Sequence, residues 1–514
     1  MNPDSPQSLD GTLLSTRAAE TAVASGPVQY VGAAPFSPDE PIPEYPFQHC
    51  VASDQGSSVY RTVREALRLL RLDDDRVDQP DWNPLSSMIS PGDTVVIKPN
   101  FVRDFRESDA SDADCVITHG AVIRAIVDYV YIALHGEGRI VIADAPHNDA
   151  DFNGIRRITQ VDRIQQFYRE AADFDLEVYD LRPEAARKVD GVIVGHDRLK
   201  GDPAGYVKVN LGSDSAFAEI NHLCHLLYGS EYDMSELHSH QHDDVHEYLI
   251  SKTILDADVV ISLPKFKTHK KVGLTVNMKN LVGINGNKNW LPHHREGTPS
   301  QGGDQFADDN VKHKLERSTV AQFKRLFPIL GPLRPIVAGP IKAMGKRIFG
   351  DTNVDAIRSG NWYGNDTTWR MVLDLNRILH YARNDGRLET RPVRKFFSLV
   401  DGIIAGEGNG PLDPIAKPCG VIIAGFNPLA VDLTCARLMG FDYERIPMLL
   451  RGLELHAYPL ANFKYEDVAI RSDRPAFDGR LSQLNGPLLA FRPHFGWAGH
   501  IELTESANEA GALA

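Results

Sequence analysis

The fold of this chain is decided by DTVVIKPN (93–100), THGAVIRAIVDYVYIAL (118–134) and GRIVIADAP (138–146), which follow one another closely. The first and third segments are short apolar runs rich in Val and Ile, which is typical of buried strands. The middle segment has apolar residues at helical spacing, with Thr118 as the expected N-cap. This order predicts a β-α-β unit, and the continuously apolar strands indicate a parallel sheet covered on both faces.

The same alternation continues toward the C-terminus. A helix and a strand are expected at 161–172 and 176–181, further strands at 257–263, 396–405 and 420–426, a helix at 427–440 and a last edge strand at 464–472. The helix at 427–440 has the usual signals at its ends, because Asn427 can cap its start and Gly440 can end it. We therefore predict an α/β protein with a doubly wound, mostly parallel sheet.

The alternation also sets the expected domain limits. A single large domain is predicted for residues 51–480, with long insertions at 182–247 and 290–395. Residues 1–50 are rich in Pro, Ser and acidic residues, so a disordered arm is expected there. Residues 481–514 are expected to form a C-terminal extension.

Composition excludes several classes of protein. The chain has 514 residues, a net charge of −14 and 42% hydrophobic residues, which are ordinary values for a globular protein, and the acidic balance argues against nucleic acid as a partner. Its five cysteines are scattered without a CxxC pair, so neither a disulfide framework nor a self-contained iron–sulfur cluster is expected. The N-terminal residues do not resemble a secretory signal, and apolar runs of spanning length are absent from the sequence. We expect a cytoplasmic protein.

A basic segment, LPKFKTHKKVGLTVNMKNLVGINGNKNWLPHHR (263–295), stands out because it carries seven Lys/Arg and no Asp or Glu. It follows a predicted strand, where open α/β sheets bind ligands, and its interleaved apolar residues indicate that it is half-buried. A solvated basic face packed on acidic neighbours is the alternative. We predict that it binds a phosphate or carboxylate. The expected anion ligands are Lys265, Lys267, Lys270, Asn280, Asn285 and Lys288, and the expected catalytic residues are His269, His293, His294 and Lys279.

Two residues outside this segment are further candidates for anion binding. Asn409 lies in GEGNGP (406–411), which is not a nucleotide fingerprint because Pro411 follows where a helix should begin. Arg370 lies one turn into a predicted helix and could reach an anion, although an exposed salt bridge explains it equally well.

Carboxylates and a histidine-rich insertion suggest a divalent metal. Asp144, Asp401 and Glu407 follow predicted strands, where carboxylates often hold a metal or substrate hydroxyls, although Asp also caps turns. His246 and Glu247 close an insertion with six histidines between 222 and 246, which could equally be a polar loop. These five residues are the predicted metal ligands.

The segment 311–350 is the second basic region, with nine Lys/Arg and one Glu mixed with apolar residues. Such a mixture suits a segment lying on a membrane surface, and a basic lid folded onto the acidic body is the alternative.

Several of these stretches together resemble one family. VVIKPNFV (95–102), ITHGAVIRAIVDYV (117–130), IVIADAP (140–146), the run 256–284, and DGIIAGEGNGP with the run 420–441 resemble the domain-of-unknown-function 362 family. The resemblance implies a cytoplasmic α/β protein. Some relatives carry an appended ferredoxin-like module and are taken for redox proteins, but this chain lacks the cysteine clusters. HEYLIS, GINGNKNWLPHH and NWYGNDTTWR resemble a longer branch, some of which is associated with surface-polysaccharide loci.

These patterns leave three hypotheses for the function. The leading one is an enzyme acting on a phosphorylated or carboxylated small molecule, such as a lipid-linked sugar intermediate. The second is an oxidoreductase that takes electrons from an external ferredoxin. The third is a non-catalytic protein that binds a membrane surface through 311–350.

Overall fold

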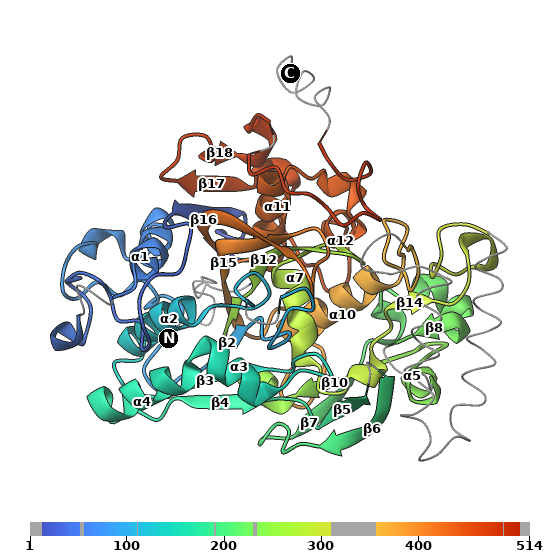
Figure 1. Ribbon diagram of the computed structural model, residues 1–514, viewed down its shortest axis with the longest axis horizontal. Coiled ribbons are helices and arrows are strands. Elements are labelled where there is room, and N and C mark those ends of the chain that lie inside the picture. Colours follow the sequence, from blue (N-terminus) through green and yellow to red (C-terminus); the bar gives the residue numbers. More distant parts are fainter. Residues whose placement is uncertain are drawn as a thin grey trace, which may run out of the picture.

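A mixed β-sheet forms the centre of the structure, a computed structural model that describes residues 13–51, 56–109, 112–189, 192–229, 234–309, 356–486 and 488–503. The sheet has eleven strands in the order β18-β17-β1-β16-β15-β11-β2-β3-β4, with the β12–β13 pair attached beside β15 (Figure 1). Its strands are β1 (Glu20–Ser25), β2 (Thr94–Pro99), β3 (Arg139–Asp144), β4 (Glu177–Asp180), β11 (Val259–Leu263), β12 (Lys265–His269), β13 (Gly273–Thr275), β15 (Lys395–Glu407), β16 (Ile415–Gly425), β17 (Ala469–Ser472) and β18 (Gly479–Arg480).

The parallel part of the sheet is the run β15-β11-β2-β3-β4, in which every neighbouring pair is parallel. β16 then pairs antiparallel with both β15 and β1, so the other half of the sheet is mixed. The predicted α/β class with a mostly parallel sheet is confirmed. β2 leads to β3 on one side while β11 lies on its other side, which makes the β2–β11 boundary the switch point of the sheet.

Helices cover both faces of this sheet, and others lie beside the smaller sheets. They are α1 (Val59–Leu69), α2 (Gly120–Ala133), α3 (Phe152–Thr159), α4 (Val161–Ala172), α5 (Ser235–His240), α6 (Lys252–Leu255), α7 (Asn277–Asn280), α10 (Thr368–Tyr381), α11 (Pro428–Met439) and α12 (Pro447–Gly452). Alternate residues of a strand enter different cores: Val95 packs with α1, α2 and α4, whereas Val96 packs with α10, α11 and α12. In Figure 1 these two helix groups lie on different sides of the strands. This explains why consecutive residues in the middle of these strands are apolar.

The ends of α11 follow the predicted chemistry. The Asn427 side chain accepts hydrogen bonds from the N–H groups of Leu429 and Ala430, and Gly440 follows the helix with φ of 84°. Such a cap contributes about 1 kcal/mol, and the left-handed conformation favours glycine.

Two local predictions are wrong. The expected disordered arm contains β1, whose residues Glu20–Ser25 pair with both β16 and β17, so residues 13–50 belong in part to the sheet. The N-cap of α2 is His119 and not Thr118, because the His119 ring accepts from Ala121 N–H while the Thr118 hydroxyl donates to the Leu263 carbonyl.

Smaller sheets lie beside the central one. β7 (Tyr206–Asn210), β10 (Val245–Ser251) and β9 (Gln241–His242) form one, β8 (Leu227–Tyr228) pairs with β14 (His294–Arg295), and β5 (Glu184–Val189) pairs with β6 (Val192–Arg198). Within the predicted insertion 290–395, α10 is buried along its whole length. Among the described helices, none has the length and apolar character needed to cross a bilayer.

Candidate functional site

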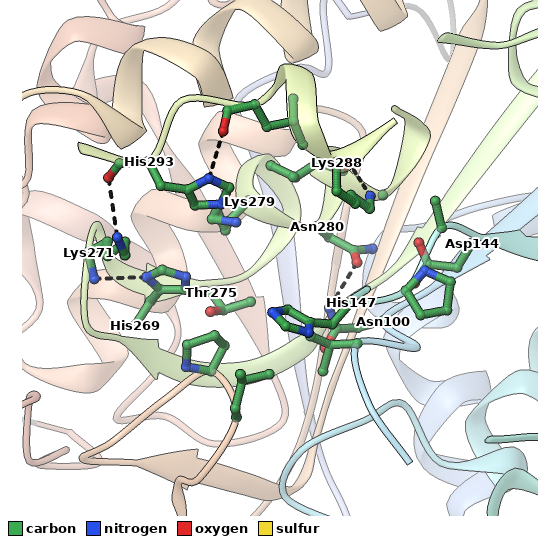
Figure 2. Close-up of a pocket in the computed structure, with 18 of the residues that line it drawn as sticks. Asn100, Asp144, His147, His269, Lys271, Thr275, Lys279, Asn280, Lys288 and His293 are labelled. Carbon is green, nitrogen blue, oxygen red and sulfur yellow. Dashed lines mark hydrogen bonds between the residues drawn. The ribbon is translucent and has the colours of Figure 1, made fainter. Parts of the chain in front are cut away.

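A cavity of about 260 Å³ lies at the carboxyl edge of the parallel strands (Figure 2). The ends of β2 and β3 supply Asn100 and Asp144, and the chain after β12 supplies further walls, including α7. Apolar side chains such as Val282 and Leu291 share the lining with polar ones. The position next to the β2–β11 switch point is where a doubly wound sheet offers a crevice for ligands.

A buried polar network forms the floor of this site. The Lys98 ammonium donates to Asp144 Oδ1 at 2.8 Å and to Asn280 Oδ1 at 3.1 Å. Asn100 Nδ2 donates to the same Asn280 oxygen at 3.2 Å, and the Lys267 ammonium donates to Asn100 Oδ1 at 3.0 Å. Residues of β2, β3, β12 and α7 are thereby held together, which fixes the strand ends against the helix.

The short helix α7 owes its position to a buried carboxylate. Asp432 on α11 accepts hydrogen bonds from Asn277 N–H and Met278 N–H, the two free donors at the start of α7, at 2.8 and 3.1 Å. Burial raises the pKa of Asp432 to about 7, against the pull of these two backbone donors. Gly283 then brings the chain against the floor, since a Cβ there would lie 1.9 Å from Asp144 Oδ1.

Lysines surround the cavity, and their partners differ. The Lys288 ammonium donates to the carbonyls of Val282 and Asn285 at 3.2 and 3.0 Å, and the Lys271 ammonium donates to the carbonyls of Ser359 and His293. Neither contacts a carboxylate in these bonds. The Lys279 ammonium makes no hydrogen bond or ion pair with any described residue.

The net charge of the residues that line the cavity follows from these contacts. Lys270, Lys271, Lys279 and Lys288 line it, and Asp144 is the one carboxylate among the described lining residues. Asp144 is already paired with Lys98. The open space therefore has an excess of positive charge, which is suited to an anionic ligand.

Burial lowers the pKa values of several of these lysines to near neutral pH. The pKa of Lys271 and that of Lys288 fall to about 7, mainly through desolvation, with Lys270 adding repulsion at Lys271. The pKa of Lys279 falls to about 8 through burial and the neighbouring Lys98 charge. Burial likewise lowers the pKa of Lys267 to about 7. A bound anion would favour the charged forms of these groups.

Two histidines line the cavity as neutral rings of opposite tautomer. His269 Nδ1 accepts a hydrogen bond from Lys271 N–H at 2.9 Å, which leaves its proton on Nε2. His293 Nδ1 lies 2.9 Å from the Leu291 carbonyl, which can only accept, so its Nε2 carries the lone pair. Burial and nearby lysine charges hold the pKa of both rings well below the usual 6.5. One ring can therefore donate and the other can accept.

The structure brings together some of the predicted site residues and separates others. Those that line the cavity are His269, His293, Lys279, Lys270, Asn280, Lys288 and Asp144. His294, Asn285, Asn409, Lys265, Lys267 and Arg370 are not among the lining residues. Lys267 does not line the cavity, but its ammonium group donates a hydrogen bond to the lining residue Asn100.

Three of these residues have structural partners instead of a ligand position. Lys265 is fully buried and pairs with Asp401 at 2.9 Å. Asn285 Oδ1 accepts from Leu249 N–H at 2.8 Å, which joins its loop to β10. The Arg370 guanidinium contacts Glu219 at 2.8 Å, so the ordinary salt bridge explains its presence.

The predicted metal ligands do not form one site. Asp144 pairs with Lys98, Asp401 with Lys265, and Glu407 with Arg492 and Lys417. His246 Nε2 lies 2.9 Å from Asn221 Oδ1, while Glu247 pairs with His240 and Lys208. Within the described ranges, no group of three or more His, Cys, Asp or Glu is placed to hold a metal ion. The strand carboxylates Asp144, Asp401 and Glu407 thus pair with lysine or arginine side chains. The second basic region, 311–350, lies outside the described residues.

Sequence reasoning missed several lining residues. Asn100 follows β2, and His147 and Asn148 follow β3, so each could have been found by inspecting what comes directly after a parallel strand. Thr275 ends β13 and is placed by tertiary structure, and its sequence carries no signal for the cavity. Lys271 is part of the recognised basic segment.

Comparisons with known proteins give a family but no reaction. A model of the family described as "Domain of unknown function (DUF362)" matches residues 95–200 and 192–437, which is more than half of the chain. A thylakoid-associated protein of Synechocystis sp. is 32% identical over 286 residues, which are 54% of this chain and 63% of that protein. The chain thus spans less than two thirds of that relative. A crystal structure of a Thermotoga maritima protein covers 73% of this chain and 58% of its own, with 9% identity and a TM-score of 0.27.

Proposed function

Because this chain belongs to the DUF362 family, whose description assigns no reaction, we propose its function from the cavity: it is an enzyme that binds an anionic small molecule and transfers protons on it. The observation that carries this proposal is the charge of the cavity. Four lysines line it, and Asp144, the one carboxylate among its described lining residues, is neutralised by Lys98. A phosphate or carboxylate group would complete this balance.

The apolar part of the lining adds to the description of the ligand. Val102, Pro146, Val282, Leu291 and Leu412 line the same space as the lysines. A ligand that is anionic at one end and apolar or uncharged at the other would therefore fit better than a bare ion.

The two neutral histidines support acid–base chemistry. His269 presents an N–H group and His293 presents a lone pair, and neither ring is protonated near neutral pH because burial and nearby lysines lower both pKa values. A donor and an acceptor at one cavity allow a proton to enter one position of a substrate while another leaves.

Anion titration of the purified full-length protein tests the binding half of this proposal. We expect sulfate, phosphate or malonate to bind the wild-type protein in isothermal titration calorimetry. Lys279→Met should weaken this binding about tenfold or more, since a charged hydrogen-bond donor contributes about 1.5–3 kcal/mol. The matched control is Lys200→Met, which removes an exposed lysine and should bind like the wild type. Wild-type protein that binds none of the three anions would refute the proposal.

A further inference from the structure

Lys279 differs from the other buried or half-buried lysines around the cavity. Lys98 is paired with Asp144, and Lys271 and Lys288 each donate to backbone carbonyls. The Lys279 side chain makes no such contact with any described residue, and it lines the cavity. Figure 2 shows its ammonium group beside the His293 ring. An amine that is neither paired nor hydrogen-bonded is available for reaction with a ligand.

The backbone around Lys279 is held firmly, although its side chain is free. Its helix is fixed at the start by Asp432, and the next residue, Asn280, is bonded to Lys98, Asn100 and Ser262. A reactive group on a fixed backbone, with its own atom left unbonded, is the arrangement that a covalent catalyst requires.

We propose that Lys279 is a nucleophile that forms an imine with the carbonyl group of a compound that also carries a carboxylate or phosphate. This inference rests on the proposed function, since the anionic group would be held by the lysines around the cavity. It adds a covalent step and a substrate class, the anionic carbonyl compounds.

The step uses groups that line the cavity and consumes one proton from solvent. The neutral Lys279 amine attacks the carbonyl carbon, a C–N bond forms, and the carbonyl electron pair moves to oxygen, where the His269 Nε2–H can donate a hydrogen bond. The His293 Nε2 lone pair takes a proton from the attacking nitrogen and returns it to the alkoxide oxygen, which becomes a hydroxyl group. A second proton, taken up from solvent, lets this hydroxyl group leave as water while the nitrogen lone pair forms the C=N bond. The product is the protonated imine, and no oxidant or reductant is used.

The surroundings of Lys279 raise the fraction of its side chain that is present as the neutral amine. The charged and titratable groups that line the same cavity are Asp144, His147, His269, Lys270, Lys271, Lys288 and His293, and Lys98 lies behind Asp144, to which it donates a hydrogen bond. The lysines outnumber Asp144, and burial and the Lys98 charge lower the pKa of Lys279 to about 8. A buried lysine beside another cation is a recognised way of activating an amine.

Reductive trapping tests this inference on the full-length protein. The probes are pyruvate for a carboxylate ligand and glycolaldehyde phosphate for a phosphate ligand, each with sodium cyanoborohydride, followed by digestion and peptide mass spectrometry. We expect one of them to modify Lys279 to near one adduct per chain, at a rate that rises with pH around a midpoint near 8. Acetone, a neutral carbonyl, should react far more slowly.

Two variants and two outcomes make the test decisive. Lys279→Arg should lose the adduct, because a guanidinium does not form this imine, and Lys200→Arg should keep it. His293→Ala should slow the trapping by about a hundredfold if its lone pair carries the proton. Wild-type protein that binds sulfate but shows no adduct at Lys279 would overturn the covalent step alone. Failure to bind any anion would overturn the proposed function as well.

Discussion

Two lysines at the carboxyl edge of the same sheet, Lys265 and Lys279, are used in different ways. Lys265 is fully buried, pairs with Asp401 at 2.9 Å and donates to the Tyr30 hydroxyl at 2.6 Å. The Asp401 carboxylate also accepts hydrogen bonds from the Tyr30 hydroxyl and from His119 N–H, so both of its oxygen atoms have partners within the protein. Lys279 is half-buried, with no such partner among the described residues, and it borders a cavity.

The difference shows what distinguishes a structural lysine from a ligand-binding one. Burying a charge is unfavourable unless a partner is buried with it, and Asp401 supplies that partner for Lys265. At Lys279 the partner is missing from the described chain, and the unfavourable burial shows as a lowered pKa. A negatively charged ligand would stabilise the buried Lys279 ammonium. The missing partner of Lys279 therefore indicates where such a ligand binds.

Removing the two lysines should therefore have different consequences for stability. Lys265→Met leaves Asp401 buried without its cation and should lower the free energy of unfolding by about 3–5 kcal/mol. Lys279→Met removes an unpaired charge and should change it little. Urea denaturation followed by circular dichroism measures both. If Lys279→Met were the more destabilising change, Lys279 would be a structural residue and the contrast would be wrong.

The close approach of the loop after α7 allows a second test of the cavity floor. A Cβ at Gly283 would lie 1.9 Å from Asp144 Oδ1 and 2.6 Å from the Lys98 ammonium. Gly283→Ala should push the loop off the Lys98–Asp144 pair, lower the free energy of unfolding by about 1–3 kcal/mol and weaken sulfate binding. Denaturation and calorimetry on the same preparation measure the two effects. Wild-type values for both would show that the floor can move without affecting the site.

The sequence predicts the sheet well because each strand carries its own signal. The middle residues of β2, β3 and β11 are apolar in succession, since alternate residues enter two different cores. The ends of α11 are likewise indicated by Asn427 and Gly440. β1 was missed because its sequence, ETAVAS, is short and follows a region rich in polar residues. Its place in the sheet depends on partners about 400 residues away in the chain, which no local pattern can report.

The candidate site was predicted in outline but not in detail. The acid-free segment indicates an anion site, and seven of the predicted residues line one cavity. The sequence could not show which lysine has a partner, because Asp401 lies 136 residues after Lys265. It also assigned metal binding to Asp144, Asp401 and Glu407, each of which holds a lysine or arginine in the structure. Pairing is a tertiary property, and it decides the role of each charge.

The pH dependence of anion binding gives the finest test of this contrast. The pKa values of Lys271 and Lys288 are lowered to about 7 and that of Lys279 to about 8, so their charges are present below this range and are lost as the pH rises through it. Sulfate keeps its own charge over the same range, so its affinity should fall by about tenfold between about pH 6.5 and 8.5. Calorimetry at several pH values measures this fall, and Lys279→Met should show a shallower one. An affinity that stayed constant would mean that these lysines remain charged over this pH range. Water or a movement of the chain would then stabilise their charges, and the missing partner of Lys279 would not define the site.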